Sequence, residues 1–197
     1  MIYVKHTKTF QNTFYLSRMK TKALFYIATI LLISSCTKEV TELPEATQTG
    51  ANTFGCKVDG NFWVPAGFGI VPTAPILEAR MVSGNTLIIN ARNFSKSPTE
   101  TEFEFRIKNV TGPGEYLLNS DVSHPSLDNS YVYYVLRKVN PLNEWLTSSQ
   151  YSGRVLITRL ETGANAFVSG TFELDAVSED DNSVIHITEG RFDVRLP

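Results

Sequence analysis

The chain has 197 residues, and its 18 basic and 20 acidic residues give a formal net charge of −2. Five of the basic residues and none of the acidic ones lie before residue 36, so the rest of the chain has a formal charge of −7. Such an acidic chain repels phosphate backbones and anionic headgroups, which argues against nucleic-acid binding and against charge-driven attachment to a membrane.

The segment 20–36, KTKALFYIATILLISSC, has the features of a secretion signal. Two lysines give it a positive start, and the apolar run Ala23–Ile33 ends in two serines and Cys36. The run is too short for a membrane-spanning helix, which needs roughly 20 apolar residues. The pattern resembles the lipobox of bacterial lipoproteins. This resemblance implies that Cys36 is acylated, with palmitate among its acyl chains, and that the protein is anchored in the outer membrane, facing the periplasm or the exterior.

The signal divides the chain into three parts. Residues 1–35 form the predicted signal peptide, with Met19 as the expected start or residues 1–18 as an extension without structure. Residues 36–51, rich in Thr and Glu, predict a lipidated flexible tether with a reach of about 20 Å. Residues 52–197 suffice for one domain with a substantial core.

From residue 52 onward the chain shows the period-two alternation of half-buried strands, interrupted by turns rich in Gly, Asn and Asp. The clearest runs are 54–58, 103–107, 155–157, 172–176, 185–187 and 192–196. We expect nine or ten strands in a single antiparallel β-sandwich, with a closed β-barrel around a ligand cavity as the alternative. Asp59-Gly60 predicts a tight hairpin. Cys56, just before it, is expected to be a small buried hydrophobe.

Three segments depart from this alternation. The spacing of apolar residues in 141–149 favours a short helical turn. The Gly- and Pro-rich segment 65–75 and the polar segment 119–129 predict long loops at one edge or end of the sheet.

Two similar segments, GTFEL at 170–174 and GRFDV at 190–194, flank an acidic turn near the end of the chain. They predict an antiparallel hairpin in which each Phe faces one side and each acid the other, with the glycines at bulges or beneath a bulky neighbour. With the opening strand TFGCKVDGNFW, they resemble a family of uncharacterised lipoproteins of Bacteroides-type bacteria, recorded as a domain of unknown function. The resemblance covers roughly residues 52–196. It implies a lipid-anchored all-β domain, and it brings no activity and no site residues.

The domain contains none of the common catalytic signatures, such as GxSxG, HExxH or a P-loop. His124 lies in a predicted loop and His186 is expected to face solvent, so we expect no catalytic residue, no metal site and no cofactor. Glu102 and Glu104 share one strand face and are expected to be solvated, although a glycosidase also uses a carboxylate pair. The acidic run 179–181 favours a plain hairpin turn over a calcium site.

Aromatic residues give the main indication of a binding site. Exposed Tyr and Trp rings stack on sugars or anchor protein partners. The candidates for ligand contact are Trp63, Phe68, Tyr131, Tyr133 and Trp145. The alternative is that they fill the space between two sheets, as a run that is apolar on both faces, such as 131–136, would do.

These observations favour a lipid-anchored, non-catalytic binding or interaction module of the cell envelope. Its expected partners are the membrane, through the anchor, and a glycan or another envelope protein, with a small apolar ligand as a further alternative. Two competing classes are a glycan-active hydrolase and a structural or protective lipoprotein with one protein partner.

Overall fold

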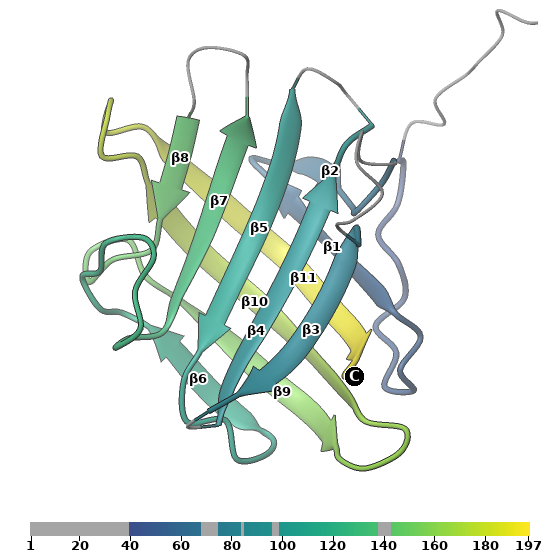
Figure 1. The fold of residues 1–197 in the computed structure, drawn as a ribbon. Coiled ribbons are helices and arrows are strands. Elements are labelled where there is room, and N and C mark those ends of the chain that lie inside the picture. The colour runs from purple at the N-terminus through teal and green to yellow at the C-terminus, as the bar shows by residue number, and fades with distance from the viewer. Residues whose placement is uncertain (1–39, 68–74, 84, 96–98, 138–142) are drawn as a thin grey trace, which may run out of the picture. The chain divides into compact units, whose positions relative to one another are not determined.

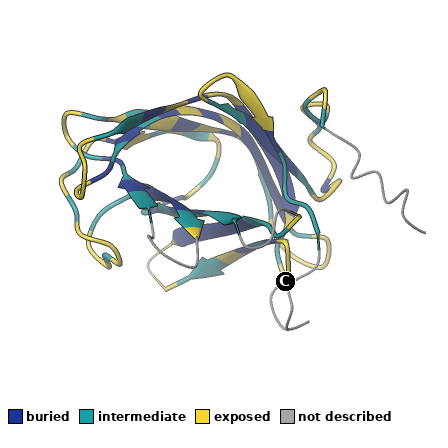
Figure 2. Cartoon of the chain, turned by 90° about the horizontal axis from the view of Figure 1, so that it is seen from above, coloured by how far each residue is buried: buried dark blue, intermediate teal, exposed yellow. Residues whose placement is uncertain are grey.

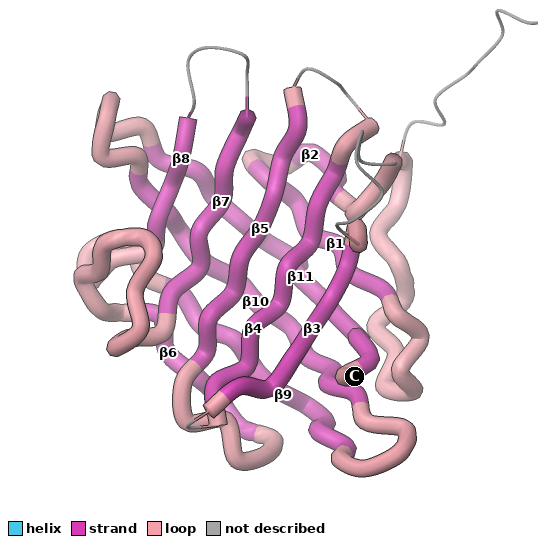
Figure 3. Tube along the Cα trace, in the orientation of Figure 1, coloured by secondary structure: helices cyan, strands magenta, loops and turns pink. Residues whose placement is uncertain are grey.

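The computed structural model describes residues 40–67, 75–83, 85–95, 99–137 and 143–197. The predicted signal peptide and two predicted site residues, Cys36 and Phe68, lie outside this part of the chain. The described residues form eleven strands and no helix (Figure 1, Figure 3). The strands are β1 (Thr53–Val58), β2 (Asn61–Trp63), β3 (Leu77–Val82), β4 (Thr86–Asn93), β5 (Glu100–Ile107), β6 (Gly114–Leu118), β7 (Tyr131–Arg137), β8 (Asn143–Leu146), β9 (Gly153–Glu161), β10 (Phe167–Val177) and β11 (Val184–Arg195).

All eleven strands belong to one antiparallel sheet that folds over into two layers (Figure 1). The front layer has the order β3-β4-β5-β7-β8, and the back layer has the order β6-β9-β10-β11-β1-β2. The layers join where Leu146 of β8 pairs with Val177 of β10. The path ends at β2 and β3, which do not pair with each other within the described residues. The predicted antiparallel all-β fold is therefore confirmed, in the form of a curled, half-open sheet.

Aromatic side chains from both layers meet in the core, and Figure 2 marks buried residues in the strands of both layers. The ring centroid of Phe54 in β1 lies 5.7 Å from that of Phe105 in β5 and 5.2 Å from that of Phe172 in β10. Cys56 belongs to the same cluster and is fully buried. Its desolvation raises the pKa of the thiol, which stays protonated. The prediction that Cys56 is a buried hydrophobe is confirmed.

The hairpin of β10 and β11 explains the repeated Gly-x-Phe pattern. Gly170 pairs with Phe192, and Phe172 pairs with Gly190. A Cβ atom at Gly170 would lie 2.6 Å from the Phe192 ring, and one at Gly190 would lie 2.4 Å from the Phe172 ring. Each glycine thus makes room for the Phe of the opposite strand, and the register shifts just after Phe172. The predicted hairpin, its crossing side chains and its bulge are confirmed.

The two short local predictions have opposite outcomes. Asp59 and Gly60 both have positive φ and close the predicted hairpin between β1 and β2. The helical turn predicted for 141–149 is wrong, because its described residues include the extended strand β8, which pairs with β7. Trp145 points into the core, whereas Leu146 packs on the outer face of β7. The apolar spacing that suggested a helix therefore comes from the two faces of a strand.

Candidate functional site

The four predicted ligand-contact aromatics that the structure describes are buried. Trp63 and Trp145 are each 8% exposed and pack in the core between the layers. Tyr131 and Tyr133 are 1% and 8% exposed, and they form a second apolar cluster with Val135 on the outer face of β7. None of these four rings presents an open face to solvent. Their burial agrees with the alternative reading, in which they pack against other side chains.

The loop before β7 covers the two tyrosines. Val122 of this loop, 119–130, packs against the tyrosine cluster. The His124 ring stacks on the Tyr133 ring, with centroids 3.6 Å apart and planes inclined by 3°. The segment 131–136 is therefore apolar on both faces because the core lies under one face and a loop lies over the other.

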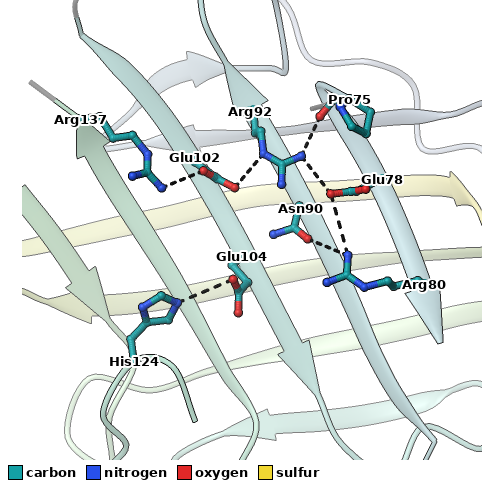
Figure 4. Close-up of polar contacts among 9 residues, drawn as sticks. All are labelled: Pro75, Glu78, Arg80, Asn90, Arg92, Glu102, Glu104, His124 and Arg137. Carbon is teal, nitrogen blue, oxygen red and sulfur yellow. Dashed lines mark hydrogen bonds and ion pairs between the residues drawn. The ribbon is translucent and has the colours of Figure 1, made fainter. Parts of the chain in front are cut away.

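Beside this loop, the outer side of the front layer carries a band of charged side chains, most of which Figure 4 shows. Alternation along β3, β4 and β5 sends apolar residues into the core and charged ones outward. We call this band the polar face, and its members are Glu78, Arg80, Asn90, Arg92, Glu102, Glu104, Arg106, Arg137 and Glu144. Glu100 lies on the same strand face as Glu102, so this side of the front layer carries five glutamates and four arginines.

Arg92 lies at the centre of the polar face and links two glutamates (Figure 4). Its Nε donates to Glu102 at 2.8 Å, and its Nη1 donates to Glu78 at 3.0 Å and to the carbonyl of Pro75 at 2.7 Å. Arg137 donates to the second oxygen of Glu102 at 3.1 Å. The side chains of Arg92 and Glu102 are only 14% and 16% exposed. This ion pair is therefore screened less by solvent and salt than an exposed pair would be.

Tyrosine hydroxyls hold the other two glutamates. The Oη of Tyr131 donates to Glu104 at 2.6 Å, and the Oη of Tyr133 donates to Glu144. Burial raises the pKa of both phenols, and the hydrogen bond and negative charge of each glutamate raise it further. Both tyrosines therefore stay protonated and act as donors. His124 lies 3.7 Å from the second oxygen of Glu104.

The sequence indicated part of this site and missed the rest. Glu102 and Glu104 share one strand face, as predicted. They lie on the outward face of the sheet, as expected, but their side chains are only 16% and 27% exposed and both are paired. Charged or polar residues at every second position of 78–80, 90–92 and 102–106 are the signal that could have located the band. The ion pairs within the band could not be predicted from the sequence, because they depend on the strand order β3-β4-β5-β7.

A second buried polar group lies in the back layer. Asp193 of β11 has no exposed surface and accepts hydrogen bonds from the Oγ1 of Thr47 at 2.6 Å and from the Oγ of Ser169 at 2.7 Å. It also accepts bonds from the backbone N–H groups of residues 49–51 at 2.9, 2.9 and 3.0 Å. The last residues of the predicted tether are thus attached to β11.

The remaining candidates lie apart from the polar face. His186 is 64% exposed, as predicted, and its Nδ1 lies 2.7 Å from Asp175. In the acidic turn, Asp181 accepts a hydrogen bond from the N–H of Ser183 at 2.9 Å, which is the bond of a plain turn. Among the described residues, no group of three or more His, Cys, Asp and Glu side chains is placed to hold a metal ion.

A protein-family comparison matches residues 51–195 to a domain of unknown function, DUF6252. The chain belongs to this family. The DUF6252 match covers all eleven strands, and its span agrees with the resemblance seen in the sequence. The comparisons with curated proteins and with solved structures found no match. In the part of the DUF6252 chain that the structure describes, no helix has the length and apolarity needed to cross a membrane.

Proposed function

We propose that the protein is a lipoprotein of the outer membrane of Bacteroides-type bacteria, anchored through acyl chains on Cys36. The proposal is supported by the lipobox-like end of the segment 20–36 and by its position ahead of the DUF6252 domain. Each buried CH₂ of an acyl chain contributes ~0.8 kcal/mol, and stable anchoring takes more than one chain. The domain then faces the periplasm or the exterior.

Metabolic labelling with a clickable fatty acid tests the anchor. The wild-type protein and a Cys56→Ser variant are expected to take up the label, and a Cys36→Ser variant is expected to take up none. Cys56 is the matched control because it is the other cysteine of the chain and is fully buried. Equal labelling of Cys36→Ser and wild type would refute the anchor.

We further propose that the DUF6252 domain is a non-catalytic binding module whose polar face holds a glycan. The observation that carries this proposal is the band of half-buried, mutually paired Arg and Glu side chains on an outward face of the sheet. Sugar hydroxyls donate and accept hydrogen bonds, so they match a surface that offers both kinds of group. The ion pairs hold these groups in place before binding, which lowers the entropy lost when a ligand binds. A small apolar ligand would remove water from these charged groups without giving them hydrogen bonds in return.

Binding suits the polar face better than hydrolysis does. A glycosidase needs one carboxyl group that gives up a proton and a second carboxylate across a cleft. Here Glu78 and Glu102 are held by arginines, and Glu104 and Glu144 are held by tyrosine hydroxyls. These contacts keep the four carboxylates as acceptors in fixed positions.

A glycan array probed with the detergent-solubilised mature protein tests the binding proposal. An Arg137→Ala variant is expected to lose roughly tenfold or more of the affinity for the glycans that the wild type retains. Arg154→Ala is the matched control, because Arg154 lies in the back layer and is 54% exposed and ion-paired, much as Arg137 is 51% exposed and ion-paired. Equal losses in both variants would contradict binding at the polar face. If the wild type retains no glycan, the glycan proposal fails and a protein partner takes its place.

A further inference from the structure

Arg106 is a charged member of the polar face for which the described residues provide no ionic partner. It lies on β5, between Ile88 of β4 and Tyr131 of β7. Its Nε atom is buried and meets no hydrogen-bond acceptor. A buried donor without an acceptor raises the free energy of the folded state, and native structures contain few of them.

The nearest acids on β5 are already engaged. Glu104, two residues from Arg106 on the same strand face, accepts a hydrogen bond from Tyr131 and lies 3.7 Å from His124. Glu102, the next acid along the strand, is bonded by two other arginines. The polar face therefore pairs these two acids with other partners, and the described residues give the Nε of Arg106 no acceptor.

Arg80 brings a second cation to the same row of the sheet. It pairs with Ile88 from β3, as Arg106 does from β5, so the two arginines flank one apolar residue. Their Cα atoms lie two strand spacings apart, about 10 Å, which is within reach of two arginine side chains closing on one group. Arg80 is 44% exposed, and its Nη1 lies 3.2 Å from Asn90 and 3.9 Å from Glu78. Both distances exceed those of a strong charge-assisted hydrogen bond.

We propose that Arg106 and Arg80 together bind an acidic group, a carboxylate or a sulfate, on the glycan that the polar face holds. This inference rests on the proposed function and adds the chemical class of the ligand to it. Guanidinium groups bind such oxygen anions through two parallel hydrogen bonds. Ile88 pairs with both arginines and is 6% exposed, so the stretch of sheet between them is apolar, which reduces the screening of their charge by water.

Calorimetric titrations of the mature protein with three oligosaccharides test this inference. The ligands are a galacturonic acid oligomer, a sulfated dextran oligomer and a neutral galactose oligomer of equal length. The wild type is expected to bind at least one acidic oligomer tenfold or more tightly than the neutral one. Arg106→Gln and Arg80→Gln are expected to abolish this preference, and the control Arg154→Gln is expected to keep it. The stronger of the two acidic ligands identifies the group as carboxylate or sulfate.

The outcomes separate this inference from the proposed function. If the neutral oligomer binds as tightly as the acidic ones, and Arg137→Ala still weakens binding, the polar face binds glycans and the acidic-group inference is overturned. If none of the oligomers binds, the acidic-group inference is also overturned. An Arg106→Gln variant that keeps the preference for acidic ligands overturns the assignment of Arg106.

Thermal unfolding of the ligand-free protein gives an independent readout. Because the described residues give the buried Nε of Arg106 no hydrogen-bond acceptor, Arg106→Gln is expected to unfold at the same temperature as the wild type or a higher one. A clear fall in the unfolding temperature would show that Arg106 serves the fold, and it would overturn the ligand-binding role.

Discussion

Asp193 carries a negative charge without any contact with solvent. Burial by itself would raise the pKa of this carboxyl, but hydrogen bonds from residues 47–51 and from Ser169 outweigh it and hold the pKa well below its usual range. The same bonds attach an early segment of the chain to its last strand. One carboxylate therefore fixes the point at which the chain enters the domain.

We expect Asp193→Asn to destabilise the domain by about 2–4 kcal/mol. The asparagine keeps the shape of the side chain, but its NH₂ group faces N–H and O–H donors and leaves part of them unpaired. Urea unfolding gives the free energy of unfolding, and limited proteolysis should show new cleavage within residues 47–51. Asp175→Asn is the control, because Asp175 is 49% exposed. Equal stability of Asp193→Asn and wild type would contradict the role of this carboxylate.

The contribution of Asp193 should also depend on pH. Because its pKa is lower in the folded state, the charged carboxylate stabilises the fold at every pH above its unfolded value of about 3.9. This stability is lost as the pH falls through the folded value. The difference in unfolding free energy between wild type and Asp193→Asn should thus be constant from pH 5 to 7 and shrink below pH 4. A difference that stays constant down to pH 3 would contradict the lowered pKa.

The paired strands β10 and β11 fit together through matched small and large residues. Gly170 and Gly190 each lie under the Phe of the opposite strand, so small and large residues alternate across the pair. A Cβ atom at Gly170 would also lie 2.4 Å from the backbone oxygen of Leu156 in β9. Gly170 is therefore confined by two neighbours, of which the backbone oxygen cannot move without disturbing the pairing of β9 and β10.

We expect Gly170→Ala to destabilise the domain by about 2–3 kcal/mol, the usual effect of forcing an extra carbon into a packed site. Gly112→Ala is the control, since a Cβ atom there meets no atom within 4 Å. That variant should stay within about 0.5 kcal/mol of the wild type. Chemical unfolding of both variants measures the difference, and similar stabilities for the two would contradict the close packing of the hairpin.

The sequence predicts strands well wherever alternation and turns are local. It placed the hairpin at Asp59-Gly60 and the buried Cys56, because each depends on neighbouring residues. It gave the burial of 131–136 only as the alternative to ligand contact. It could not predict that the segment 47–51 binds Asp193, because the two lie more than 100 residues apart in the chain. It also missed the pairing of the polar face, because β5 pairs with β7 and β6 pairs with β9. Strand order is a property of the whole chain.

Across the whole domain, two tryptophans tie the layers together. Trp63 lies in the back layer and donates its Nε1–H to the Oγ1 of Thr101 in the front layer at 2.8 Å. Trp145 lies in the front layer and donates its Nε1–H at 2.9 Å to the Oγ of Ser183, the residue just before β11 of the back layer. Both indole rings also pack in the shared core. The two layers thus depend on each other for packing and for hydrogen bonds.

This arrangement predicts that the two layers unfold as one cooperative unit. The chain has two tryptophans, so Trp63→Phe leaves Trp145 as the probe of the front layer, and Trp145→Phe leaves Trp63 as the probe of the back layer. Each variant is expected to lose about 1 kcal/mol with its interlayer hydrogen bond. Within each variant, the urea midpoint from tryptophan fluorescence should equal the midpoint from far-UV circular dichroism, which reports on all strands. A fluorescence midpoint that differs from the dichroism midpoint in either variant would show that one layer unfolds before the other.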